Sequence, residues 1–228
     1  MPVKLPTTTD GQNLFAARLK ESLQGERLVW CLGSRIELLG VSHVPPVAPF
    51  VVGGATTTTE AAEIVKETFA SMLIADDVPE AGSGIELLKA HRHLKTVLIT
   101  ARENEATVKE AVEAGVDAII FRSQIGMRGE GTFVPALAAV ARGATYLPET
   151  IAGMTTTADE WALGLVVDLT DRERNVLSAV GRGFDNAEIA EEMFASEETV
   201  KSHLKSIRQK LGVSDRVKLA LIAIHSGI

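Results

Sequence analysis

A run of basic side chains that contains no acidic residue lies between Thr199 and Lys210. Lysine and arginine in such a run can neutralise the phosphates of a nucleic acid, and this contributes much of the affinity of proteins for DNA. The whole chain has a formal net charge of −7, but residues 169–228 hold nine basic and nine acidic residues and are neutral. The charge therefore excludes a general polyanion binder and leaves room for a local phosphate-binding face.

The same run has the apolar spacing of an amphipathic helix. Positions four, three and four residues apart share one helical face, and they hold Val200, Leu204, Ile207 and Leu211. The opposite face then carries Lys201, Ser202, Lys205 and Arg208, flanked by His203 and Ser206. A helix of this kind suits the major groove, where Lys donates to guanine and Ser or His reads donors or acceptors. Basic side chains later in the run and beyond it are better placed for phosphates, namely Arg208, Lys210 and Arg216.

Three more helices are expected around this one. Thr170 and Glu173 form a capping box at the start of the first helix, and Asn186 is expected to cap the second. Gly212 ends the basic helix, and a last helix runs from about Arg216 to His225. Four short helices without strands predict a small all-α helix-turn-helix domain.

Taken together, these residues resemble the LuxR-type (GerE) DNA-binding domain. The matching runs are Leu169-Thr170-x-Arg172-Glu173-x-x-Val176-Leu177, Asn186-x-Glu188-Ile189-Ala190, Thr199-Val200-Lys201-x-His203 and Lys210-Leu211-Gly212-Val213-x-x-Arg216. The resemblance implies that the third helix enters the major groove and that the fourth supplies a dimer surface. It implies base and groove contacts by Lys201, Ser202, His203 and Lys205, and backbone contacts by Thr199, Lys210 and Arg216. The acidic pair Glu197-Glu198 departs from the family pattern and opposes phosphates nearby.

The front of the chain has a different pattern, in which short apolar runs alternate with amphipathic stretches. Strands are expected at 28–32, 50–52, 72–75, 97–100 and 118–121, and helices at 13–23, 59–69, 84–91, 105–114 and 132–142. This alternation predicts a doubly wound α/β domain with a parallel sheet. We expect a receiver-like domain over residues 1–147 with an extra N-terminal helix, a linker over 148–168, and the helix-turn-helix domain over 169–228. The segment 42–49 is too rich in proline to be helical.

Two stretches of the front domain, MLIADDVPEAGSGIELL and TVLITARENEATVKEAVEAGVDAIIFRS, resemble the receiver domains of response regulators. The resemblance implies a five-stranded parallel sheet with helices on both faces. It places Asp76 at the phosphoacceptor position, Thr100 at the position of the hydroxyl that bonds the phosphoryl group, and Arg122 where a lysine is usual. Arginine keeps the charge but is bulkier and differently directed, so the exchange is not conservative.

The acidic pair that binds magnesium in receivers is missing after the first strand. Gly33, Ser34 and Arg35 stand there, and Glu37 lies too far along the chain to replace it. Transfer of a phosphoryl group needs its charge neutralised, and magnesium held by carboxylates supplies most of that. The sequence therefore predicts a pseudo-receiver in which Asp76 has a structural role. Magnesium is expected as a cofactor only if Asp76 is phosphorylated, and no other cofactor or metal is expected.

These observations predict a sequence-specific, dimeric transcription regulator of the two-component type that binds double-stranded DNA without needing phosphorylation. One alternative is a phosphorylation-dependent regulator that uses Asp76; another is a protein-interaction adaptor that has lost DNA binding. A sensor kinase or another regulatory protein is a possible partner. No catalytic set is visible, so an enzyme is not expected, and the few aromatic residues disfavour an acyl-lactone sensor. The single cysteine and the lack of a signal peptide or a long apolar run predict a cytoplasmic protein without membrane contact.

Overall fold

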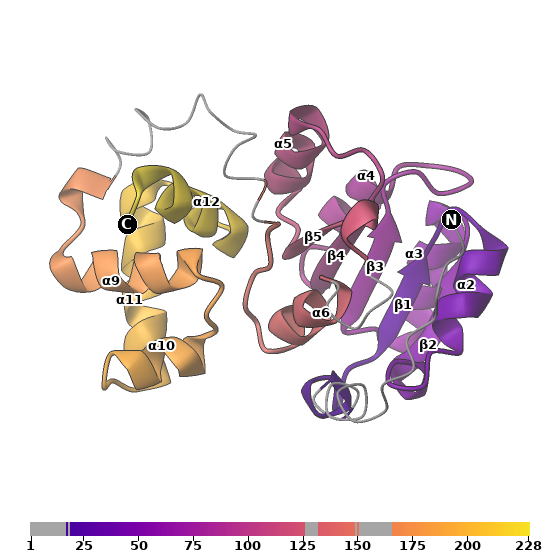
Figure 1. The fold of residues 1–228 in the computed structure, drawn as a ribbon, viewed down its shortest axis with the longest axis horizontal. Helices are drawn as coiled ribbons and strands as arrows, with labels where there is room; N and C mark the ends of the chain where they lie inside the picture. The colour runs from indigo at the N-terminus through magenta and orange to yellow at the C-terminus, as the bar shows by residue number, and fades with distance from the viewer. Residues whose placement is uncertain (1–16, 18, 126–131, 149, 151–165) are drawn as a thin grey trace, which may run out of the picture.

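A computed structural model describes residues 17, 19–125, 132–148, 150 and 166–228. Its front part contains a sheet of five parallel strands in the order β2-β1-β3-β4-β5 (Figure 1). The strands are β1 (Leu28–Cys31), β2 (Val51–Ala55), β3 (Met72–Asp76), β4 (Lys95–Thr100) and β5 (Ala118–Phe121). This is the predicted doubly wound receiver-like sheet, and β2 forms one of its edges.

Helices cover both faces of this sheet, because successive residues of each buried strand point to opposite sides. In β1, Val29 and Cys31 join one apolar core, while Leu28 and Trp30 join the other. The first core is covered by α3 (Thr58–Thr68), α4 (Gly84–Ala90) and α5 (Glu105–Ala114), and the second by α6 (Phe133–Ala141) together with Leu19 and Leu23. Burial raises the pKa of the Cys31 thiol to about 12, as happens to a thiol that packs as an apolar residue in a core.

Helix α2 (Arg35–Ser42) was not expected from the sequence. Its start is set by Ser34, whose hydroxyl accepts a hydrogen bond from the amide of Ile36 at 3.3 Å. None of its residues is fully buried, and Leu38 and Val41 pack only partly against the second core, so its apolar stripe is too weak for periodicity to detect. The segment 42–49 was predicted not to be helical; most of it is not, but Ser42 is the last residue of α2 and a short 3-10 helix spans Ala48–Phe50. Of the expected helix 13–23, the described residues 17 and 19–22 are helical, and the remaining part of 13–18 lies outside the described residues.

The C-terminal part is the predicted bundle of four helices around an apolar core of its own. The helices are α9 (Asp171–Gly181), α10 (Asn186–Glu192), α11 (Glu197–Leu211) and α12 (Arg216–Ser226). The capping box of Thr170 and Glu173 is confirmed. The cap of α10 is Asp185 rather than Asn186, because the Asp185 carboxylate accepts hydrogen bonds from two amides of the first turn. Most of the expected linker lies outside the described residues, although Val166 already packs in this core.

The two parts contact each other through α12 and the start of α10. Val217 of α12 is buried against the apolar core beneath α5. The Nε atom of Arg142, just after α6, lies 2.9 Å from a carboxylate oxygen of Asp185. Each helix in the described parts of the chain is too short or too polar to cross a bilayer.

Phe194, in the turn between α10 and α11, has a left-handed backbone with φ of 52° and is 99% exposed. A residue with a β-carbon pays about 1–2 kcal/mol in this region, and an exposed ring recovers little of it by packing. We therefore expect Phe194→Gly to raise the free energy of unfolding by about 1 kcal/mol, after the entropic cost of glycine. Urea unfolding measures this. Phe194→Ala is the control, since it removes the ring but keeps the β-carbon; a glycine variant less stable than the alanine variant would refute the strain.

Candidate functional site

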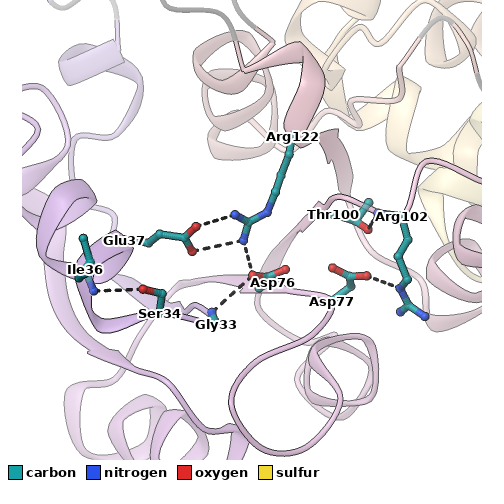
Figure 2. A network of polar contacts seen from close by, with 9 residues as sticks. All are labelled: Gly33, Ser34, Ile36, Glu37, Asp76, Asp77, Thr100, Arg102 and Arg122. Carbon is teal, nitrogen blue, oxygen red and sulfur yellow. Dashed lines mark hydrogen bonds and ion pairs between the residues drawn. The ribbon is translucent and has the colours of Figure 1, made fainter.

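Asp76 lies at the end of β3, and an arginine from the end of β5 reaches it. A terminal nitrogen of the Arg122 guanidinium, Nη2, forms an ion pair with the carboxylate of Asp76 (Figure 2). The same guanidinium holds Glu37 of α2 in a two-point contact, with Nη1–Oε1 at 2.7 Å and Nη2–Oε2 at 3.3 Å. Arg122 thus links three elements of the domain at the site where receivers are phosphorylated.

A second ion pair lies beside the first. Asp77 is buried next to Asp76 and binds the Nε atom of Arg102. The backbone amide of Arg102 donates to the hydroxyl of Thr100 at 2.9 Å, which fixes the loop after β4. Thr100 therefore lies at the site as expected, but its hydroxyl already takes part in the contacts of this loop.

The two neighbouring carboxyl groups have opposite pKa shifts. Burial, and then the hydrogen bond with Asp77, raise the pKa of Asp76, and the charge of Arg122 only partly opposes this. Burial also acts to raise the pKa of Asp77, but hydrogen bonds from Arg102, Asp76 and Thr100 outweigh it and lower the pKa. Asp77 is thus the more readily ionised member of the pair.

The residues at this site do not fit a magnesium ion. The position after β1 where receivers carry acidic ligands is occupied by Gly33, and a β-carbon there would lie 2.8 Å from the carbonyl oxygen of Val78. The amide of Gly33 points at the Asp76 carboxylate instead, at 3.4 Å. The guanidinium of Arg122 already lies between Asp76 and Glu37, and its positive charge repels a divalent cation.

Sequence analysis considered Glu37 only as a substitute for the missing acidic pair and did not predict its contact with Arg122. Because α2 begins at Arg35, its first turn directs Glu37 toward the end of β5. The carboxylate meets the arginine that replaces the usual lysine, so it balances charge and does not substitute for a metal ligand. The serine cap of α2 is the sequence signal that could have revealed this.

The recognition surface is built by α11. Its buried side is formed by Val200, Leu204, Ile207 and Leu211, as the spacing predicted. Lys201, Ser202 and Lys205 are exposed together on the other side, and His203 is half-buried beside them. Thr199 is exposed at the first turn, where its hydroxyl lies 2.9 Å from that of Ser196. The ion pair of Lys201 with Glu198, at 3.5 Å, joins two exposed side chains and holds them weakly.

Comparison of the sequence with known proteins identifies the family of the domain that contains α11. The family described as "Bacterial regulatory proteins, luxR family" matches residues 167–223. In Bacillus subtilis (strain 168), the transcriptional regulatory protein LiaR is 30% identical over 181 residues, covering 76% of this chain and 83% of LiaR. The uncharacterized transcriptional regulatory protein YxjL of the same strain is 31% identical over 179 residues, covering 72% of this chain and 78% of YxjL. The chain belongs to the LuxR-type transcriptional regulatory proteins.

The fold agrees with this family. A solved complex of the two-component response regulator RcsB with DNA is 23% identical to this chain, with a TM-score of 0.50. The similarity covers 88% of this chain and 98% of the RcsB chain. The predicted pairing of a receiver-like domain with a LuxR-type helix-turn-helix domain is therefore confirmed. The relatives are named as regulatory proteins and not as enzymes.

Three basic residues of the LuxR-type domain lie differently from the exposed lysines of α11. The Arg216 guanidinium donates to Asn186 Oδ1 at 2.9 Å and to the carbonyl oxygen of Phe184 at 2.5 Å. Burial, followed by the nearby charge of Arg208, lowers the pKa of Arg216 to about 10. Arg208 itself is half-buried. The predicted phosphate contact of Arg216 would require its side chain to leave these acceptors, so the structure assigns it a role in holding α12 to α10.

Lys210 is also engaged within the protein. Its Nζ atom lies 2.7 Å from the buried carboxylate of Glu173 and 3.2 Å from the carbonyl oxygen of Asp168. Glu173 further accepts hydrogen bonds from the Ser206 hydroxyl at 2.6 Å and from the amide of Thr170 at 2.8 Å. The capping glutamate therefore ties the start of α9 to α11. A phosphate contact by Lys210 stays a prediction, and it competes with this ion pair.

The Glu173 network predicts an acid-sensitive domain. Burial raises the pKa of Glu173, but hydrogen bonds from Lys210, Ser206 and Thr170 outweigh it and lower the pKa to about 2. Because the folded-state pKa is depressed, the carboxylate stabilises the domain above its ordinary value of 4.5, and this contribution is lost as the pH falls toward 2. We expect Glu173→Gln to lower the free energy of unfolding at pH 7 by about 2–3 kcal/mol.

Urea unfolding at several pH values measures this difference. The stability gap between Glu173→Gln and the unmodified protein should narrow as the pH falls from about 4.5 toward 2. Glu197→Gln, at an exposed position of α11, is the matched control. A gap that stays constant over this range would show that the Glu173 charge does not contribute.

Proposed function

We propose that this protein binds double-stranded DNA in a sequence-specific manner, as a homodimer that regulates transcription. The observation that supports this most directly is the division of α11, whose apolar side is buried while Lys201, Ser202 and Lys205 stand exposed in its N-terminal half. A helix of this kind, preceded by a short turn from α10, can insert into the major groove. We assign the protein no catalytic activity, and we place it in the cytoplasm because that is where bacterial DNA lies.

DNA binding is tested with the full-length protein and a pool of random duplexes, measured by fluorescence anisotropy. The double variant Lys201→Glu/Lys205→Glu should abolish detectable binding, since it reverses two charges on the DNA-facing side. The double variant Lys66→Glu/Lys109→Glu reverses two exposed lysines on α3 and α5 and should leave binding intact. Equal DNA binding by both variants would show that Lys201 and Lys205 of α11 do not contact the DNA. An unmodified protein that binds no duplex in the pool would favour a protein-interaction adaptor that has lost DNA binding.

We further propose that the receiver-like domain works without phosphorylation. The supporting observation is the position of Arg122, which pairs with Asp76 and Glu37 at once. Phosphorylation would add a strongly negative group to Asp76, and that group needs a metal ion or a free cation to neutralise it. Here the cation is already committed to two carboxylates. The input signal then reaches this domain through another protein, and a sensor kinase that donates phosphate is not needed.

This second proposal is tested by incubating the protein with acetyl phosphate and magnesium and measuring its intact mass. No phosphorylated species should form under conditions that label another response regulator in a parallel reaction. A phosphorylated species that disappears in the Asp76→Asn variant would overturn the proposal, and would favour the phosphorylation-dependent alternative.

A further inference from the structure

A groove runs along the open edge of the sheet, between α2 and α3. It has a volume of about 530 Å³, which is within the range of sites that bind protein side chains or small ligands. Its apolar lining comes from Gly54 and Ala55 of β2, Leu38 of α2 and Ile64 of α3. It is separate from the Asp76 site and from the recognition helix α11.

Two glycines of β2 let the helices on either side of the groove approach the strand closely. A β-carbon at Gly54 would lie 2.2 Å from a methyl carbon of Leu38, and one at Gly53 would lie 2.3 Å from a methyl carbon of Ile64. Because both strand positions lack a side chain, Leu38 of α2 and Ile64 of α3 pack directly on the strand backbone. Gly53 and Gly54 face opposite sides of the sheet, so Ile64 packs on one face of this edge strand and Leu38 on the other, and both of these side chains line the groove.

One wall of the groove is acidic. Glu60, Glu63 and Glu67 follow one another at helical spacing on α3, and all three are exposed. Within the described parts of the chain, none of the three forms an ion pair, and Arg35 is the basic residue that lines the groove. The wall thus presents an excess of negative charge beside the apolar lining.

The other wall carries apolar side chains that no described residue of the domain covers. Leu39 lines the groove and is 63% exposed, and Ile36 on the same helix is 82% exposed. Large apolar side chains that are this exposed and lie beside a groove mark interaction sites more often than isolated ones do. Within the described part of the chain, helix α2 thus presents exposed apolar side chains beside the groove.

We propose that this groove binds a basic amphipathic helix of another protein. Leucine-sized side chains of that helix would contact Leu38, Leu39 and Ile64. Lysines or arginines one and two turns apart would pair with Glu63 and Glu67. Anchors at this spacing are the usual way in which a helix binds in a groove. The acidic wall selects a basic partner and disfavours an acidic one.

The same helix connects the groove to the Asp76 site, which makes the groove a route for regulation. Glu37 projects from α2 to Arg122, whereas Leu38 and Leu39 on the next two positions line the groove. A partner that shifts α2 changes the contact between Glu37 and Arg122, and so the contact of Arg122 with Asp76. This input role rests on the proposed phosphate-independent function, but the binding of a basic helix does not.

Binding is tested on the full-length protein with a fluorescein-labelled synthetic peptide, in which leucine repeats every third and fourth residue and lysine fills the adjacent positions. The protein should bind this peptide, and Glu63→Lys/Glu67→Lys should weaken binding about tenfold or more. Leu39→Ser should weaken it by a similar factor. The double variant Glu110→Lys/Glu113→Lys, which reverses two exposed acids on α5, should bind as the unmodified protein does.

Three outcomes would overturn the proposal. One is equal binding by the α3 and α5 double variants, and another is equal binding of a peptide that carries glutamate in place of lysine. The third is loss of the dimer in sedimentation of Glu63→Lys/Glu67→Lys, which would make the groove an interface between two copies of this chain. The input role is tested separately by DNA affinity with and without the peptide. A DNA affinity that the peptide does not change would refute the input role. If the protein does not bind DNA at all, the peptide-binding assay still tests the groove by itself.

Discussion

Replacing Arg122 with alanine is expected to lower the free energy of unfolding by about 2–3 kcal/mol. The variant leaves the carboxylate of Asp76, which is 6% exposed, without its ion-pair partner. A fully buried pair would cost more, but the side chains of Arg122 and Glu37 are 33% and 41% exposed, and water compensates part of the loss.

The pH dependence of this loss identifies its cause. Burial already raises the pKa of Asp76, and removing Arg122 raises it further. A carboxyl group with a raised pKa destabilises the folded state when it is charged, so the deficit should be largest near neutral pH and should shrink as acid protonates Asp76. Urea unfolding of Arg122→Ala and of Arg122→Ala/Asp76→Asn measures this, since the asparagine removes the unpaired charge.

The matched control for Arg122 is Arg92→Ala, which removes an exposed arginine that follows α4. It should change the stability by less than about 0.5 kcal/mol. If Arg122→Ala costs no more than this control, the contact with Asp76 and Glu37 does not stabilise the domain. The proposal that Arg122 neutralises the phosphorylation site would then lose its support.

Replacing Lys201 with alanine is expected to weaken binding to the preferred DNA site by about 1–3 kcal/mol, and to relax the choice of base at one position. Lys201 is exposed in the first half of α11, and its ion pair with Glu198 is weak enough to be given up on binding. Competition titrations with single-base variants of the site measure both effects.

The control for Lys201 is Lys109→Ala, which removes an exposed lysine from α5 and should leave the affinity unchanged. How the loss of affinity varies among DNA sequences shows what Lys201 contacts. An equal loss on every sequence, together with a shallower dependence on salt, would mean that Lys201 contacts a phosphate and does not read a base.

The elements that sequence analysis predicted best are those whose apolar pattern matches a buried face. Helix α5 has the predicted bounds because it presents a regular apolar stripe to one core, and strand β5 does because its four apolar residues are buried on both faces of the sheet. The exposed side of α11 followed from the same argument, since Val200 and Leu204 fix which residues face outward. Helix α2 was not predicted because its apolar residues Leu38 and Val41 are only partly buried, and the role of Glu37 was missed with it.

The contacts of the basic residues depend on the tertiary fold, and sequence analysis could not assign them. A positive charge near a recognition helix suggests DNA, but Arg216 meets acceptors at Phe184 and Asn186, about thirty positions earlier in the chain. Lys210 meets Glu173 in the same way. The capping box predicted the place of Glu173 at the start of α9. The lysine that pairs with Glu173 comes from another helix, and the capping box does not identify it.

The most direct test of a DNA-binding regulator that needs no phosphate is selection from a randomised duplex pool. The purified full-length protein is used with and without acetyl phosphate and magnesium, and bound sequences are compared. We predict that palindromic sites are enriched equally under both conditions, because two copies of α11 read two half-sites and Arg122 already neutralises Asp76. Enrichment only after treatment with acetyl phosphate and magnesium would contradict this account and establish Asp76 as a working phosphoacceptor.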